Sequence, residues 1–234
     1  MDDEGIEKEK GADKQYPDEF SDSEEDKEDY TIRKTDSLIV AATAENDHSN
    51  LEVYIYEHEK SNLYVHHEII LGAYPLCLEW IPTFYRKRAN MIAVGTFLPE
   101  IEIWNLDSES CDPAAVLGSI DLSEQAKKQS VSKKYKKNKA PQNVFSEQTH
   151  TDAIMSLSLN PFQSEYLVSG SADHTVRIWD LDELECKATY ANLHTDKVQA
   201  VKWNCLNEQV LLSGGYDGKL NIIDVREKES SLQH

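Results

Sequence analysis

Four residues whose side chains could take part in chemistry lie in one stretch of this sequence. They carry an imidazole, a hydroxyl, a carboxylate and an indole: His150, Ser169, Asp173 and Trp179. Serine, histidine and aspartate together are the residue types of nucleophilic catalysis. The same side chains have a structural purpose when they are buried, because an imidazole and an indole N–H both need hydrogen-bond partners there. No nucleophile elbow and no metalloprotease, phosphate-binding or dinucleotide-binding motif accompanies them. We therefore favour the structural interpretation and predict that the protein is not an enzyme.

Neither a metal site nor a disulfide framework is predicted. His66 and His67 are adjacent in a strand-like segment, and no other ligand type stands at a useful spacing from them. The four cysteines show no C-x-x-C spacing: Cys77, Cys111, Cys186 and Cys205. The opening residues do not resemble a signal peptide, and no apolar run is long enough for a membrane span. We expect a reduced, soluble, intracellular protein without cofactor, metal or small-molecule substrate.

The segments that must position these residues repeat along the chain. An offset of 44 carries residues 150–181 onto 194–225, and an offset of 75 carries 91–107 onto 166–182. A weaker copy occupies residues 38–57. Each copy has a small-residue strand, a polar turn and an alternating strand. A period of about 40–45 residues with this pattern is typical of a β-propeller blade, and one blade needs neighbours to bury its faces.

We predict an all-β fold, a partial WD-repeat β-propeller with about three and a half blades. In the WD repeats that these units resemble, an aspartate orients a histidine, the histidine meets a serine, and the serine meets a tryptophan indole. The unit at 150–182 has all four members of this structural tetrad. The next unit has Ile223 in place of the tryptophan, so its tetrad is incomplete and consists of His194, Ser213 and Asp217. The unit of Trp104 has Val94 and Leu98 at the serine and aspartate positions and lacks the tetrad.

Charge is distributed unevenly over the 234 residues. The net charge of −19 excludes a protein that coats nucleic acid nonspecifically, since phosphate binding needs a basic surface. Residues 1–30 carry fourteen acids against four lysines, and we predict a disordered acidic tail over residues 1–35. Ser21 and Ser23 lie among these acids and are phosphorylation candidates for acidophilic kinases. A tail that only keeps the protein soluble is the alternative.

A lysine-rich insert is predicted between the second and third units, at residues 121–149. It holds seven lysines against three acids. Its segment KKYKKNK is the kind of run that nuclear import receptors or nucleic acids bind. We therefore predict a nuclear-import run made of Lys133, Lys134, Lys136, Lys137 and Lys139. The alternative is a solvated loop that its lysines keep extended.

Four segments give the chain a more particular resemblance: ENDHSNLEVYIYE, NLYVHHEIILGAYPLCLEW, VGTFLPEIEIWNLD and HTDKVQAVKWN. Over about residues 36–226 the chain closely resembles the periodic tryptophan protein family, in its first, nucleolar branch. The resemblance includes the acidic N-terminus and the lysine-rich insert. It implies a nuclear and nucleolar WD-repeat scaffold in large-subunit ribosome assembly and rRNA processing. The alternative is a histone-binding regulator of ribosomal gene transcription.

The predicted organisation contains fewer blades than the resemblance implies. The first WD-type blades occupy residues 36–120, two further blades occupy 150–226, and a tail follows at 227–234. Propellers close with roughly four to eight blades. We therefore expect either a C-terminally truncated sequence or a short form that completes its ring with a partner. An open arc would expose sheet edges and an apolar flank.

A partner surface is predicted at one rim of the propeller. By analogy with WD-repeat proteins, it comes from the start of each inner strand and the turn before the aspartate. Carried onto this sequence, these positions are Tyr74, Leu76, Phe97, Met155, Lys197, Gln199 and Tyr216. Exposed aromatic and methionine side chains would anchor a partner, whereas packing between loops is the alternative. The predicted partners are pre-ribosomal components or histones, and RNA contact is expected to be indirect or weak.

Overall fold

The computed structural model describes residues 33, 35–45, 48–108, 110–118 and 149–227, together with the backbone of 231–233. These residues form four antiparallel β-sheets and contain no helix. The all-β prediction is therefore confirmed. The predicted acidic tail, apart from residues 33 and 35, and the lysine-rich insert, apart from residue 149, lie outside the described residues.

Each sheet is a meander in which strands pair in chain order. Sheet 1 consists of β1 (Ser37–Glu45), β2 (His48–Glu57) and β3 (Asn62–Leu71). Sheet 2 consists of β4 (Pro75–Phe84), β5 (Lys87–Thr96), β6 (Ile101–Asn105) and β7 (Ala115–Leu117). Sheet 3 consists of β8 (Ile154–Leu159), β9 (Tyr166–Ser171), β10 (Val176–Asp180) and β11 (Glu185–Tyr190). Sheet 4 consists of β12 (Val198–Trp203), β13 (Val210–Gly215), β14 (Leu220–Asp224) and β15 (Ser231–Gln233).

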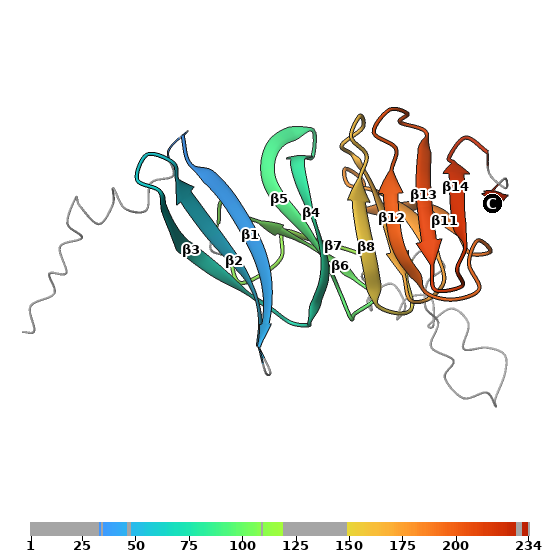
Figure 1. The fold of residues 1–234 in the computed structure, drawn as a ribbon, viewed down its shortest axis with the longest axis horizontal. Coiled ribbons are helices and arrows are strands. Elements are labelled where there is room, and N and C mark those ends of the chain that lie inside the picture. The colour runs from blue at the N-terminus through green and yellow to red at the C-terminus, as the bar shows by residue number, and fades with distance from the viewer. Residues whose placement is uncertain are drawn as a thin grey trace, which may run out of the picture.

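The sheets follow one another as an open series, from sheet 1 at the blue end of the chain to sheet 4 at the red end (Figure 1). The first strands of sheets 2, 3 and 4 are neighbours, because β8 contacts both β4 and β12. We call β4, β8 and β12 the innermost strands. Three hydrophobic cores fill the three spaces between adjacent sheets. This stacking is the burial that a repeating unit requires.

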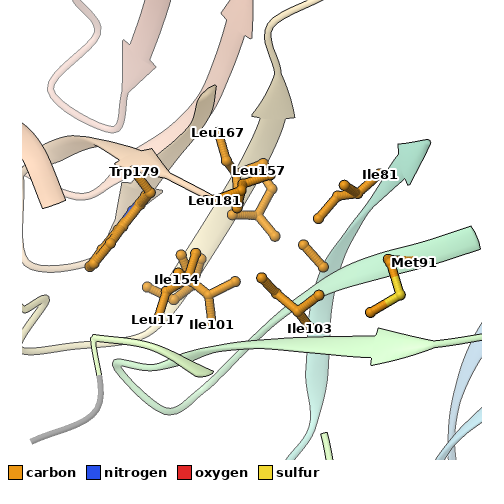
Figure 2. Close-up of a cluster of buried hydrophobic side chains, with 11 residues drawn as sticks. Ile81, Met91, Ile101, Ile103, Leu117, Ile154, Leu157, Leu167, Trp179 and Leu181 are labelled. Atoms are coloured by element: carbon orange, nitrogen blue, oxygen red, sulfur yellow. The ribbon is translucent and has the colours of Figure 1, made fainter. Parts of the chain in front are cut away.

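The core between sheets 2 and 3 shows how a blade buries its face. Ile154 and Leu157 of β8 lie among Ile101 and Ile103 of β6, with Trp179 at the side of sheet 3 (Figure 2). All five side chains are buried. Each fully buried Ile or Leu contributes about 1.5–3 kcal/mol relative to an exposed one, before the cost of ordering it. The alternation that predicted these strands therefore reflects real contacts between sheets.

Two equivalent glycines allow the sheets to approach closely. A Cβ on Gly95 of β5 would lie 2.5 Å from Cys77 Sγ and 2.7 Å from Ile154 Cγ2. A Cβ on Gly170 of β9 would lie 2.7 Å from Val198 Cγ1. In both cases the first residue of the next innermost strand presses against the glycine. The small residue of each repeat is thus a packing requirement between blades.

The predicted blade number agrees with the structure, whereas the predicted C-terminal tail differs from it. The count of about three and a half blades corresponds to three four-stranded sheets and one three-stranded sheet. Residues 227–234, predicted as a tail, include β15, which pairs with β14. With three residues, this strand is too short to show an alternating apolar pattern in the sequence.

Candidate functional site

The histidine network of sheet 3 makes the contacts predicted for the complete tetrad. The Nε1 atom of Trp179 donates a hydrogen bond to Ser169 Oγ over 2.8 Å. His150 Nε2 lies 2.7 Å from the same oxygen, and His150 Nδ1 lies 2.9 Å from Asp173 Oδ2. Thr175 Oγ1 donates to Asp173 Oδ1 over 2.6 Å. The network ties the segment before β8 to β9, to β10 and to the turn between them.

Burial determines the protonation of this network. His150 is fully buried, and its burial lowers the pKa of the imidazole, although Asp173 opposes the shift. Burial would raise the pKa of Asp173, but hydrogen bonds from His150, Thr175 and the Thr151 backbone N–H outweigh it and hold that pKa below its usual range. A neutral imidazole therefore donates from Nδ1 to an ionised carboxylate, and its Nε2 accepts from the Ser169 hydroxyl.

The chemistry of this site is structural. Ser169 and His150 have no exposed surface, and the serine oxygen is engaged by both His150 and Trp179. A nucleophile must reach its substrate, which this buried hydroxyl is not placed to do. Removing any member would leave buried polar atoms without partners, which is costly in a low-dielectric interior.

Within the described ranges, no group of three or more His, Cys, Asp or Glu side chains is placed to hold a metal ion. His66 and His67 lie next to each other in β3 with their Nδ1 atoms 2.8 Å apart. All four cysteines are free thiols. The part of the chain that the structure describes contains no helix with the length and apolar character of a membrane span.

The second histidine network, in sheet 4, uses the three predicted residues. His194 Nε2 lies 2.9 Å from Ser213 Oγ, and His194 Nδ1 lies 3.1 Å from Asp217 Oδ1. The hydrogen bond from the backbone N–H of Thr195 and, to a smaller extent, the hydrogen bond with His194 hold the pKa of Asp217 below its usual range. The same histidine–aspartate arrangement therefore forms in both repeats.

Asn221 is a member of this second network that the sequence analysis missed. It is buried, and its Nδ2 donates to His194 Nε2 over 3.0 Å and to the Leu193 carbonyl over 3.1 Å. Ile223 stands where Trp179 stands in sheet 3, so no indole reaches this serine. The tetrad is incomplete as predicted, yet the histidine gains a different donor.

Asn221 marks a position that is polar in all three four-stranded sheets. The equivalent residues are Glu102 in β6 and Arg177 in β10. Glu102 Oε2 accepts from Trp104 Nε1 over 3.0 Å, which supplies the acceptor that Val94 does not provide. The signal in the sequence was a polar residue two positions before the tryptophan position, on the same face of the strand.

Three residues of the predicted partner surface occupy β-bulges at the same point of the innermost strands. Pro75 pairs with Thr96 and Cys77 with Gly95, so Leu76 is the extra residue in β4. The same displacement makes Met155 the extra residue in β8 and Gln199 the extra residue in β12. A bulge redirects its side chain out of the regular alternation. Binary patterning does not predict these bulges, because it assumes a strict period of two.

The other four residues of the predicted surface lie at the same rim, where the innermost strands begin and the second strands end. The backbone N–H of Phe97 donates to the Tyr74 carbonyl over 3.2 Å, and that of Tyr216 donates to the Lys197 carbonyl over 2.9 Å. The rings of Tyr74 and Phe97 meet edge to face, with centroids 6.4 Å apart. Phe97 and Tyr216 are 61% and 64% exposed. Together with the bulged residues they form the upper rim: Tyr74, Leu76, Phe97, Met155, Lys197, Gln199 and Tyr216.

Sheet 3 contributes Met155 to the upper rim, and small residues occupy its other equivalent positions. The bond equivalent to those of Phe97 and Tyr216 joins the Ala172 N–H to the Ala153 carbonyl over 2.9 Å. Both alanines are buried. The upper rim therefore presents an aromatic pair on sheet 2 and a tyrosine with a lysine on sheet 4, separated by a small-residue segment.

Two further predicted sites lie outside the described residues. They are the nuclear-import run (Lys133, Lys134, Lys136, Lys137 and Lys139) and the phosphorylation candidates Ser21 and Ser23. Both remain predictions from the sequence.

Comparison with known proteins relates the chain to WD-repeat proteins. Residues 141–180 and 184–224 match the family described as WD domain, G-beta repeat. An uncharacterized WD repeat-containing protein of Schizosaccharomyces pombe is 44% identical over 170 residues, which are 70% of this chain and 31% of that protein. The Periodic tryptophan protein 1 homolog of Drosophila melanogaster and Periodic tryptophan protein 1 of Saccharomyces cerevisiae are each 35% identical, over 74% of this chain and 34% of the relative. The chain thus spans about a third of the length of the curated relatives it matches.

Proposed function

Since the chain belongs to the periodic tryptophan protein 1 family of WD-repeat proteins, we propose that it acts as a non-enzymatic scaffold in large-subunit ribosome assembly and rRNA processing. The nucleus, and the nucleolus within it, is the proposed location. The proposal rests on the resemblance of the segments around residues 45–57 and 62–80, and on the lysine-rich run as an import signal.

The upper rim is the observation that supports a binding role. It collects three bulged side chains and three exposed aromatic groups on one side of neighbouring sheets. Residues that stay exposed on a rigid scaffold are positioned for a partner at little entropic cost. Lys197, exposed beside Tyr216, adds a positive charge that suits a partner with a carboxylate or phosphate.

A second candidate function is a chromatin role, which the charge of the N-terminal segment favours. Fourteen acids among residues 1–30 attract basic partners such as histone tails or ribosomal proteins. Phosphorylation at Ser21 or Ser23 would deepen that negative charge. The two functions share a fold and a compartment, so RNA dependence is the property that separates them.

Sedimentation of the endogenous protein in a nuclear extract, with and without RNase, separates the two functions. An assembly factor should move with large-subunit precursors and shift to lighter fractions after RNase. Movement with nucleosomes that RNase leaves unchanged would support the chromatin role. A protein found only in light fractions before RNase would contradict both.

The upper rim is tested by replacing Phe97 and Tyr216 with Ala in one variant. Co-sedimentation should fall about tenfold or more, because aromatic anchors at an interface contribute about 2 kcal/mol or more. The matched control replaces Phe162 and Leu206, which are exposed in the loops after β8 and β12 at the opposite rim. Both variants should unfold at the same urea concentration. Equal co-sedimentation of the two variants would place the contact elsewhere.

A further inference from the structure

The turn between β4 and β5 carries the only run of three consecutive cations in the sequence: Arg86, Lys87 and Arg88. Tyr85 precedes them, and all four residues are exposed. The turn lies opposite the upper rim, on the same side as the loops after β8 and β12 (Figure 1). In a chain with a net charge of −19, an exposed basic turn indicates a local binding site for anions.

The backbone of this turn is strained. Phe84 pairs with Lys87, so Tyr85 and Arg86 form a two-residue hairpin loop. Both loop residues have a positive φ, of 49° and 58°. This conformation favours asparagine and glycine, because a bulkier side chain crowds the backbone there. Tyrosine and arginine are poor residues for the loop, which indicates that they are present for their side chains.

Contacts with sheet 3 hold the turn in place. Arg86 Nε donates to Asp182 Oδ2 over 2.8 Å. Thr83 Oγ1 and Ser164 Oγ share a second hydrogen bond between the two sheets. Phe84 packs against the core between sheets 2 and 3. A turn held in this way loses little conformational entropy when it binds a ligand.

The cations of the turn keep most of their charge for a ligand. Within the described ranges, neither Lys87 nor Arg88 has an ion-pair partner. The side chain of Arg86 is 88% exposed, and only its Nε takes part in an ion pair. Glu165 and Asp180 lie close enough to act on Arg86. Because of these acids, the turn attracts an anion by direct contact rather than by a long-range field.

Tyr85 adds an aromatic surface beside the cations. It is 49% exposed, and its ring lies against that of Phe84 with the centroids 4.4 Å apart. A half-exposed ring that is supported from one side is suited to stack on an unpaired base. An acidic peptide would use the cations of the turn without needing the ring. The combination of a ring and cations therefore favours a single-stranded nucleic acid.

We infer that this turn binds single-stranded RNA, whose phosphates contact its cations and whose unpaired bases stack on its tyrosine. The inference deepens the proposed function and rests on it for the choice of RNA, because ribosome assembly takes place on RNA. The net charge of −19 excludes a protein that coats nucleic acid, but contact with about three phosphates needs only a local basic surface. The site is separate from the upper rim, which stays available to a protein partner.

Fluorescence anisotropy of a labelled RNA of about twelve uridines measures binding to the purified full-length chain. The anisotropy should rise in a saturable manner as the protein is added at about 50 mM salt. Affinity should fall about tenfold or more between about 50 and 200 mM salt, because roughly three phosphates are neutralised. No saturable binding up to about 100 μM protein at the lower salt concentration would overturn the inference.

Charge reversal with a matched control tests the location. Lys87→Glu together with Arg88→Glu should weaken RNA binding at least tenfold and flatten its salt dependence. The control, Lys202→Glu together with Lys219→Glu, makes the same change of net charge at two exposed positions of sheet 4 and should have a far smaller effect. Equal losses in the two variants would show a general effect of charge and overturn the turn as the site.

Variants of the loop test the role of the aromatic ring. Tyr85→Ala should weaken RNA binding about fivefold or more, whereas Tyr85→Phe should retain it, because both rings stack on a base. Binding by Tyr85→Ala at the original strength would contradict the stacking contact.

A second loop variant separates binding from folding. Tyr85→Asn together with Arg86→Gly supplies the residues that the loop conformation favours. This variant should unfold at a higher urea concentration and bind RNA more weakly. Lower stability with unchanged RNA binding would show that the two residues serve folding, and the inference would be wrong.

Other ligands and other sites give distinct results. If a polyglutamate peptide displaces the RNA with equal affinity and Tyr85→Ala weakens neither ligand, the turn is a site for acidic peptides and the inference is wrong. It is also wrong if glutamines in place of the lysines of the nuclear-import run abolish RNA binding while the charge reversal in the turn leaves it intact.

Failure of the proposed function would be recognised separately. In that case the purified chain would bind RNA through the turn, but the endogenous protein would not sediment with large-subunit precursors. The inference would then stand without the proposed function. Sedimentation with precursors, combined with a purified chain that binds no RNA, would leave the proposed function intact and overturn the inference.

Discussion

Sheets 3 and 4 have the same sequence pattern at an offset of 44 residues, yet they differ in how completely they are buried. Sheet 3 lies between sheets 2 and 4, and every residue of β10 is buried. Sheet 4 packs against sheet 3, and its strand β14 alternates between buried or half-buried and exposed residues. The sequence repeat therefore specifies a strand and its turn, whereas the number of sheets that pack against the strand determines how completely the strand is buried.

The equivalent glycines of the two sheets differ in the same way in the space available for a Cβ atom. A Cβ on Gly170 would lie 2.7 Å from Val198 Cγ1 of sheet 4. The nearest atom to a Cβ on Gly214, the equivalent residue of sheet 4, is Leu220 Cδ1 at 3.9 Å, which is an ordinary contact. The same residue type is thus required in one sheet and tolerated in the next.

The largest expected effect concerns the two histidine networks. His150→Ala should lower the free energy of unfolding by about 3 kcal/mol, because Ser169 and Asp173 lose a buried partner and the Trp179 contact is disturbed. His194→Ala should cost about 1–2 kcal/mol, since no indole depends on Ser213. Urea unfolding curves of the two variants measure the difference. A larger loss for His194→Ala would refute the proposed ranking.

Glycine replacement gives the next effect. Gly170→Ala should destabilise the protein by about 1–3 kcal/mol, because the added methyl group overlaps Val198. Gly214→Ala should change the free energy of unfolding by less than about 0.5 kcal/mol. Thermal unfolding of both variants under one buffer condition is the measurement. If both substitutions destabilise the protein equally, the closer packing around Gly170 does not explain the effect.

Acidification should weaken sheet 3 through His150. Burial lowers the pKa of this histidine in the folded state, so the unfolded chain binds the proton more readily as the pH falls through the ordinary histidine value of about 6.5. Stability is therefore full above that pH and declines below it, by at most about 1.4 kcal/mol per pH unit. Urea midpoints between pH 7.5 and about 5 test this. The variant His150→Gln should have a flatter profile, and an unchanged slope would contradict the assignment.

The smallest effect is on thiol reactivity. Cys186 of sheet 3 is half-buried, and its Sγ lies 3.4 Å from the Ala188 carbonyl, whereas Cys205 of sheet 4 is exposed. A thiol reagent should modify Cys205 about tenfold or more faster than Cys186 in the native protein. Cys77 provides an internal control for slow reaction, because burial raises the pKa of its thiol to about 12. Mass spectrometry of labelled peptides gives the rates, and similar rates at Cys186 and Cys205 would be inconsistent with the burial difference.

The sequence predicted the local part of the candidate site well. His150, Ser169, Asp173 and Trp179 meet as expected because all four belong to one repeat, where strand alternation and a short turn fix their positions. The bulges at Leu76, Met155 and Gln199 were not predicted, since an extra residue interrupts the pairing without changing the composition. Asn221 was missed because its role depends on Ile223 replacing a tryptophan two residues later.

The sequence by itself determined the repeat, the strands and the contacts within each unit, because hydrophobic alternation and turn residues act over a few positions. The tertiary structure alone decided which of the equivalent residues are covered. Trp80 and Trp203 are the same residue at the same strand position, and one is 59% exposed while the other is 5% exposed. Gly170 and Gly214 differ in the same way. The physical reason is that burial is a property of the space between two sheets, and that space depends on which strand lies across it.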